Sequence, residues 1–156
     1  MNWDSVAQAM SLHLPMDYRE FVEIYGGGEM DEYFSISTPP VPGSAYGDLL
    51  DGLDPALPTR DLNQLAEQLA SNAVPPLLPF GTTAHGDVSF WLREGPADNW
   101  NVASFRRQSP PGTARWTVFD GGMVEFFLAF LTGTVEPFTV GSLVGQQHEY
   151  VNWRDL

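Results

Sequence analysis

The sequence predicts a single α+β domain in which helices pack at the sides of an antiparallel sheet of about five strands. Three observations support this prediction. The 156 residues are enough to form one hydrophobic core. Apolar residues recur every three or four positions in much of the first half, as in amphipathic helices, and every second position in the second half, as in strands. The connections between the predicted strands are short, which favours antiparallel neighbours. Residues 1–156 are therefore treated as one domain.

The most strongly marked element is a helix that begins near Leu14 and ends at the glycines in positions 26–28. Pro15 suits its first turn, because proline has a fixed helical φ and no N–H to satisfy there. Glycine adopts the left-handed conformation that ends helices. A shorter helix is predicted before it, from Trp3 to His13, with Asp4 as its N-cap. One apolar stripe follows the main helix: Leu14, Tyr18, Phe21, Val22 and Tyr25.

The middle of the chain changes character twice. Apolar and polar residues alternate from Tyr33 to Ser37, which predicts a short strand. The segment from Pro39 to Pro58 is rich in proline, glycine and aspartate and has few apolar anchors. We expect a long surface loop there, mobile or ordered by a ligand, with one helical turn near Leu49. Leucines then return at helical spacing and predict a helix from Arg60 to Ser71.

The second half is dominated by strand-like segments. Phe90 and Trp91 must point to opposite faces of their strand, so we expect helices to cover one face of the sheet and only part of the other. A very apolar helix is predicted from Met123 to Leu131, and the apolar residues in the tail from Glu136 to Leu156 predict that the tail docks on the domain. The predicted strands are Leu77–Phe80, Val88–Leu92, Trp100–Arg107 and Arg115–Phe119.

Composition excludes several classes of function. The formal net charge is −13, which disfavours binding to nucleic acid and to anionic membranes because both carry dense negative charge. No segment approaches the roughly 20 apolar residues that cross a bilayer. The first residues lack the basic and apolar regions of a signal peptide, so we expect a cytoplasmic protein. Cysteine is absent, which excludes disulfides, thiolate metal sites and a cysteine nucleophile.

The sequence offers no catalytic constellation. The histidines at positions 13, 85 and 148 do not have the spacing of metal ligands, so we expect no metal site and no cofactor. His85 and Asp87 are the one pair that would suit acid–base chemistry, but residues two apart before a strand more often cap a turn. We therefore expect a binding protein, and a small enzyme centred on His85 and Asp87 is the less favoured alternative.

Three motifs resemble the SUKH superfamily, most of whose members are bacterial immunity proteins against secreted toxins. The segment Leu78 to Gly81, followed by His85-Gly86-Asp87, resembles the family's central hairpin, and the helix from Met123 to Leu131 resembles its closing helix. The opening helix and its glycine turn resemble the family's first motif at Leu14, Pro15, Asp17, Tyr18, Phe21, Tyr25, Gly26 and Gly27.

The resemblance implies a protein that binds and neutralises a cognate toxin in the cytoplasm of the producing cell. It also implies an alternative, because fungal members of the family act in regulation. In that case the protein would be a regulatory or scaffold protein of the same fold that binds another protein partner. The presence or absence of a neighbouring toxin gene would separate the two.

Acidic residues are concentrated in the first half of the chain. From Asp17 to Asp61 there are ten of them against two arginines, a local charge of −8. Such a surface would mimic the phosphates that a basic nuclease binds and would speed encounter with it. We therefore expect a protein toxin as partner, a basic nuclease being one class that fits, and a monomer or weak homodimer. The exposed sheet face around Trp91 and Arg93 is the alternative binding surface. The candidate contacts are Glu29, Asp31, Glu32, Asp48, Asp51 and Asp54.

Overall fold

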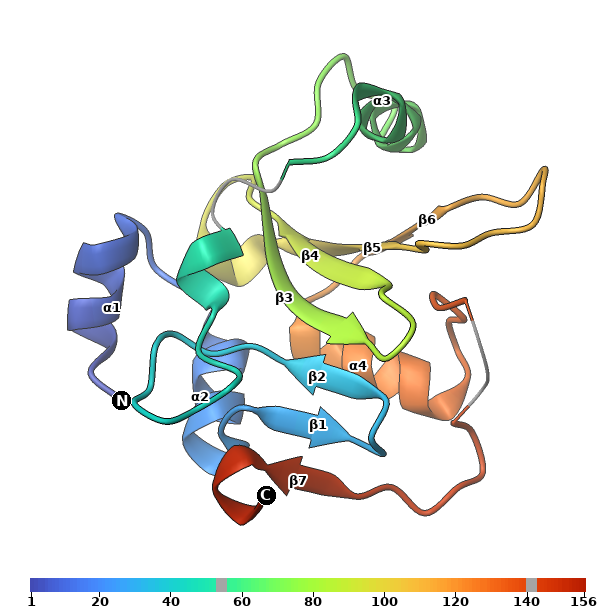
Figure 1. Cartoon of the computed structure of the whole chain (residues 1–156). Helices are drawn as coiled ribbons and strands as arrows, with labels where there is room; N and C mark the ends of the chain where they lie inside the picture. Colours follow the sequence, from blue (N-terminus) through green and yellow to red (C-terminus); the bar gives the residue numbers. More distant parts are fainter. Residues whose placement is uncertain (53–55, 140–142) are drawn as a thin grey trace.

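One antiparallel sheet of seven strands organises the computed structural model, which describes residues 1–52, 56–139 and 143–156. The strand order is β6-β5-β4-β3-β2-β1-β7, so the last strand returns to lie beside the first (Figure 1). The prediction of an α+β fold with a single antiparallel sheet is confirmed. The strands are β1 (Gly28–Met30), β2 (Phe34–Ile36), β3 (Leu77–Thr83), β4 (Val88–Leu92), β5 (Asn101–Phe105), β6 (Trp116–Phe119) and β7 (Tyr150–Asn152).

The predicted count of about five strands is too low, because β1 and β7 are each only three residues long. β1 begins at Gly28, a residue expected only to end the preceding helix. A Cβ at this position would lie 2.1 Å from the carbonyl oxygen of Val151, so glycine is what allows β7 to approach β1. The pairing of Gly28 with Asn152 also confirms that the tail docks on the domain.

The helices are α1 (Trp3–Met10), α2 (Met16–Tyr25), α3 (Thr59–Gln68) and α4 (Met123–Thr132). α2 agrees with its prediction: Pro15 precedes it, and Gly26, at φ 71°, donates its N–H to Val22 O at 2.8 Å. α1 begins at Trp3 as predicted, but its cap and its C-terminal end differ from the prediction. Its cap is Asn2, whose side chain accepts the N–H of Ser5 at 3.0 Å, and the helix ends early because Ser11 takes the left-handed conformation.

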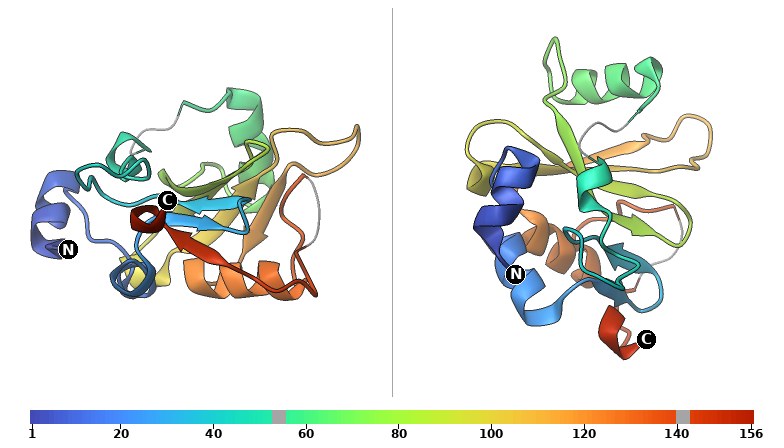
Figure 2. Two further views of the ribbon diagram at one scale, coloured as in Figure 1. Left: turned by 60° about the horizontal axis from the view of Figure 1, so that its bottom comes forward. Right: turned by 60° about the vertical axis from the view of Figure 1, so that its left-hand side comes forward.

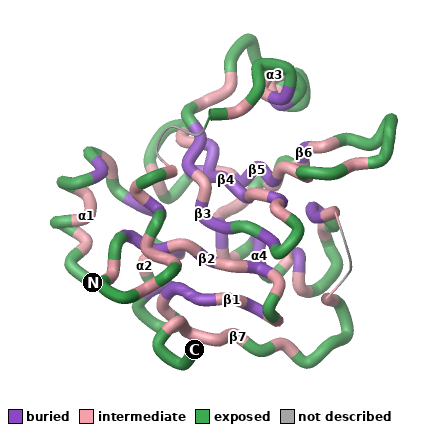
Figure 3. The backbone as a smooth tube through the Cα atoms, viewed as in Figure 1, coloured by how far each residue is buried: buried purple, intermediate pink, exposed green. Residues whose placement is uncertain are grey.

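Hydrophobic side chains fill both faces of the sheet. α2 and α4 cover the larger core on one face, and α3 covers a smaller cluster around Phe90 on the other (Figure 2). Figure 3 shows the buried residues following the central strands. Trp91 is fully buried in the larger core, with its ring 4.9 Å from that of Tyr18. The prediction that helices cover one face of the sheet and part of the other is confirmed. The prediction of an alternative, exposed binding surface around Trp91 is wrong, because the tryptophan side chain faces α2 and not solvent.

The segment that follows β2 is more firmly packed than predicted. Leu49 is 1% exposed and belongs to the larger core, which contradicts the expectation that this segment has few apolar anchors. Thr38 donates its N–H to Tyr46 O at 2.6 Å and accepts the N–H of Leu49 at 3.1 Å. The expected helical turn is present as a 3-10 helix, η1 (Leu49–Gly52). Residues 39–52 are therefore anchored to the domain, and residues 53–55 of the predicted loop lie outside the described residues.

Candidate functional site

Three of the six predicted contact residues lie on β1 and on the turn that follows it. Glu29 occupies the middle of β1, between the buried residues Gly28 and Met30. Since strand side chains alternate, Glu29 points away from the core that α2 and α4 cover. Its cross-strand neighbours are Ser35 of β2 and Val151 of β7, both small enough to leave the carboxylate partly exposed.

The turn between β1 and β2 holds two acidic residues in an unusual backbone conformation. Asp31 and Glu32 both have φ 54°, and Tyr33 donates its N–H to Met30 O at 2.9 Å. This is the arrangement of a type I′ turn, which normally favours asparagine or glycine. A left-handed conformation costs about 1–2 kcal/mol at an ordinary residue. The turn therefore holds Glu32, which is exposed, in a strained position at the protein surface.

Asp31 joins this turn to the segment that leads into β7. Its Oδ2 lies 2.8 Å from His148 Nδ1, and its Oδ1 accepts the N–H of Glu149 at 2.8 Å. Its side chain is 12% exposed. Asp31 therefore holds two strands together and offers little free carboxylate to a partner. Glu149, by contrast, is exposed beside it, and the sequence contained no signal for it because the pairing of β7 with β1 was not predicted.

The other predicted contacts belong to the segment that packs beside β1. Tyr46 lies against Gly27, and burial raises the pKa of its phenol, with a further rise from the neighbouring Glu29 carboxylate. This places Glu29 next to the part of the segment that carries Asp48, which is exposed. Asp51 is exposed on η1, which contacts β3. Asp54 lies outside the described residues.

We call these side chains the acidic band. It has no basic residue from the same stretch of chain to balance it, because positions 20–59 contain neither arginine nor lysine. One of its carboxylates is on β1, three are on segments that lead into or out of paired strands, and two are on the anchored segment, so the backbone that carries them is held in place before any partner arrives. The acidic band consists of Glu29, Asp31, Glu32, Asp48, Asp51 and Glu149.

The structure does not bring His85 and Asp87 together as an acid–base pair. Asp87 is completely buried, and four donors occupy its two oxygens: Thr83 Oγ1, Arg107 N, and both N and Oγ1 of Thr139. A carboxylate accepts about four hydrogen bonds, so none remains for an imidazole. His85 is exposed and contacts the ring of Tyr33.

Asp87 instead joins three parts of the chain. It caps the β3–β4 turn, where its N–H donates to Thr83 Oγ1 at 3.1 Å and Thr83 N–H donates to its carbonyl oxygen at 2.9 Å. The same carboxylate holds the end of β5 and the segment after α4 through Arg107 and Thr139. The prediction that these residues cap a turn is confirmed, and the second SUKH-like motif thereby has a structural explanation.

No family model matches this chain, and neither a curated protein nor a solved structure matches it significantly. In residues 1–52, 56–139 and 143–156, no three histidine, aspartate or glutamate side chains gather as metal ligands would. Over the same ranges, every helix is too short or too polar to cross a membrane. The site is therefore characterised by its own geometry, as a set of carboxylates on β1, on the turn that follows it, on the residue before β7 and on the segment 39–52.

Proposed function

We propose that this protein is a non-catalytic, acidic protein-binding module, and specifically an immunity protein that neutralises a cognate protein toxin in the cytoplasm. The observation that carries the proposal is the acidic band, with its carboxylates on β1, on the turn after it, on the residue before β7 and on the anchored segment 39–52. A basic partner is the natural complement of such a surface. The motifs that resemble the SUKH superfamily support the toxin as the kind of partner.

The band would act in two ways on a basic toxin. Its summed field attracts a cationic surface and raises the association rate, an effect that falls as salt increases. Once docked, carboxylates on fixed backbone occupy the cationic groups that would otherwise bind phosphates. A nuclease is the toxin class that this chemistry fits best, because its substrate site must be basic.

A capture experiment in the native host tests the proposal. The wild-type protein is used as bait beside a triple variant, Glu29→Gln, Glu32→Gln and Asp48→Asn, which keeps the fold but removes three exposed charges. We expect the wild-type bait to retain a basic protein that the variant retains poorly. That protein should be toxic when expressed alone and harmless when co-expressed with the wild-type chain.

Two results would count against it. A captured partner that is not toxic would favour a regulatory or scaffold role for the same surface. A toxic partner that both baits retain equally would remove the acidic band from the interface.

A further inference from the structure

Four of the seven arginines gather at one corner of the molecule, far from the acidic band. Arg60 begins α3, Arg106 and Arg107 follow β5, and Arg115 precedes β6. β6 and β7 are the two edge strands, so this corner and the acidic band lie at opposite edges of the sheet (Figure 1). The molecule therefore separates its charges, although its net charge is strongly negative.

A hollow of about 530 Å³ lies between the start of α3 and the hairpin that joins β5 to β6. Small-molecule sites in proteins typically measure about 300–1,000 Å³. We call this feature the arginine hollow. The residues that line it include three arginines together with residues that carry amide or hydroxyl donors: Arg60, Arg107, Arg115, Gln64, Ser109 and Thr113.

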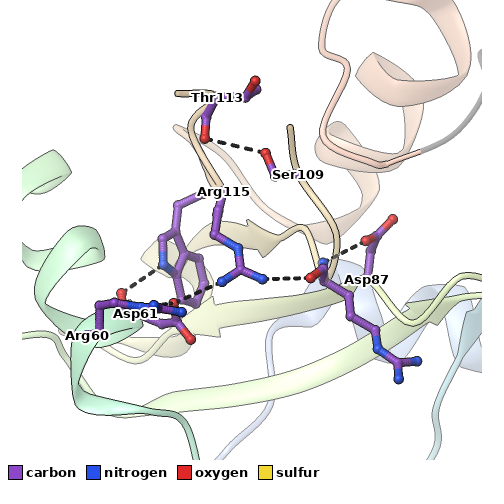
Figure 4. A network of polar contacts seen from close by, with 8 residues as sticks. Arg60, Asp61, Asp87, Ser109, Thr113 and Arg115 are labelled. Atoms are coloured by element: carbon purple, nitrogen blue, oxygen red, sulfur yellow. Dashed lines mark hydrogen bonds and ion pairs between the residues drawn. The ribbon is translucent and has the colours of Figure 1, made fainter. Parts of the chain in front are cut away.

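Arg115 is held in one orientation by three separate contacts. Its Nη1 lies 3.4 Å from Asp61 Oδ1, and its Nη2 donates to the carbonyl oxygen of Arg107 at 2.6 Å (Figure 4). Its guanidinium also lies over the ring of Phe105, 4.8 Å from the centroid. A guanidinium that is fixed before binding loses less entropy when it meets an anion.

Arg60 and Arg107 differ from the arginines that serve the fold. Arg106 donates to the carbonyl oxygens of Pro137 and Glu136, and so has a structural role. The Arg60 side chain is 75% exposed and its one ionic contact, with Asp61, is at 3.9 Å. Within the described part of the chain, the Arg107 guanidinium makes no hydrogen bond or ion pair; only its backbone does. These two cations are free to meet a ligand.

We propose that the arginine hollow binds a small phosphate-bearing molecule through its phosphate groups. Three guanidinium groups beside the single carboxylate of Asp61 leave a local charge of +2, which attracts the several negative charges of a diphosphate more strongly than the single charge of a monocarboxylate. Arginine binds phosphate oxygens in a bidentate manner. The lining contains no aromatic side chain on which a nucleobase could stack, so the phosphates carry the recognition. The proposal is independent of the protein partner of the acidic band.

Calorimetric titration with pyrophosphate, joined to ¹⁵N-resolved NMR of the full chain, tests this site. The variants are Arg60→Gln and Arg107→Gln, singly and together, because neither side chain has a structural hydrogen bond to lose. Arg154→Gln is the matched control, since Arg154 is exposed, its guanidinium lies over the ring of Trp153, and it follows β7 at the opposite edge of the sheet. Citrate serves as a comparison anion of similar charge and different chemistry.

We expect saturable binding of pyrophosphate with a Kd below about 1 mM, with shifts at the amides of residues 107–113. The double variant should weaken binding about tenfold or more, and the control should stay within about twofold. No saturable binding, or binding that the double variant leaves unchanged, would overturn the site. If citrate bound with the same affinity as pyrophosphate, phosphate recognition would be overturned, because the arginine hollow would then respond only to the charge of the anion.

Discussion

The carboxylate of Asp17 in α2 caps the N-terminus of α4, where its Oδ2 accepts the backbone N–H of Val124 at 3.1 Å. α4 starts after Gly122, which has no side chain to serve as a cap. A Cβ at Gly122 would lie 2.6 Å from Asp17 Oδ2, so the glycine is what lets the carboxylate reach the helix end. A residue of α2 thus fixes α4 over the core.

Asp17→Ala should lower the free energy of unfolding by about 1–2 kcal/mol, because α4 loses a charged cap at its positive end. Asp17→Asn should lose less, since the amide oxygen can still accept the hydrogen bond. Urea unfolding measures both. Glu20→Ala, an exposed change in the same helix, is the control and should shift stability by no more than about 0.5 kcal/mol. Equal losses in Asp17→Ala and Glu20→Ala would show that the cap carries no stability.

Asp87→Ala should be far more damaging, by about 3–5 kcal/mol, because one buried and three partly buried donors lose their acceptor at once. Asp120→Ala removes an exposed carboxylate and should have little effect. Thermal and urea unfolding report the difference. If both aspartates proved equally dispensable, Asp87 would not be the junction of β3, β5 and the segment after α4.

Glu32→Gly should stabilise the protein by about 0.5–1 kcal/mol, since glycine accepts φ 54° without the steric cost that glutamate pays. The same substitution at Glu67, an exposed position inside α3, should destabilise by about 1 kcal/mol. A gain in stability in Glu32→Gly together with a loss of stability in Glu67→Gly would establish that the acidic turn is strained. A loss of stability in Glu32→Gly would contradict the strain at that residue.

Stability should fall at alkaline pH because of two buried phenols. Burial raises the pKa of both Tyr18 and Tyr150, and their hydroxyls donate to Ser37 O at 2.6 Å and Gly26 O at 2.8 Å. In the unfolded chain these groups ionise near the ordinary value of about 10. Their contribution is therefore complete below pH of about 10 and is lost as pH rises above it. The chain has no lysine to titrate in the same range.

Urea unfolding between pH of about 8 and 11 measures this loss. In Tyr150→Phe the decline should be shallower, because one of the three phenols with a raised pKa, those of Tyr18, Tyr46 and Tyr150, is gone. Identical pH dependence in wild type and variant would mean that Tyr150 ionises as easily in the folded chain as in the unfolded one.

Local patterns explain which parts of the fold the sequence could predict. Val88–Leu92 was predicted with its observed bounds, because a run of β-branched and aromatic residues between turn signals defines a strand on its own. β1 and β7 could not be found in this way because, unlike the equally short β2, they do not lie in a longer run of alternating apolar and polar residues. Their pairing depends on contacts such as Gly28 with Asn152, between opposite ends of the chain.

The candidate site shows the same limit. Its acidic residues can be read from the sequence, but which of their side chains are exposed depends on contacts with residues far away in the chain. The Asp31 carboxylate is not free for a partner, because the pairing of β7 with β1 brings His148 Nδ1 within 2.8 Å of its Oδ2. The same pairing places Glu149 in the acidic band. The arginine hollow was not predicted either, because Arg60 and Arg115 meet only when α3 packs against β6.

The association rate with the captured toxin, measured by stopped flow at low and high salt, tests the central claim most directly. The triple variant Glu29→Gln, Glu32→Gln, Asp48→Asn is compared with wild type and with a control of equal charge in which exposed acids elsewhere are neutralised: Glu67→Gln, Glu94→Gln, Asp155→Asn. If the acidic band steers the partner, the band variant should associate about tenfold or more slowly at low salt and show a flatter salt dependence, while the control stays close to wild type. Equal rates and slopes in the two variants would contradict the account, because only the net charge of the protein, and not the acidic band, would then guide binding.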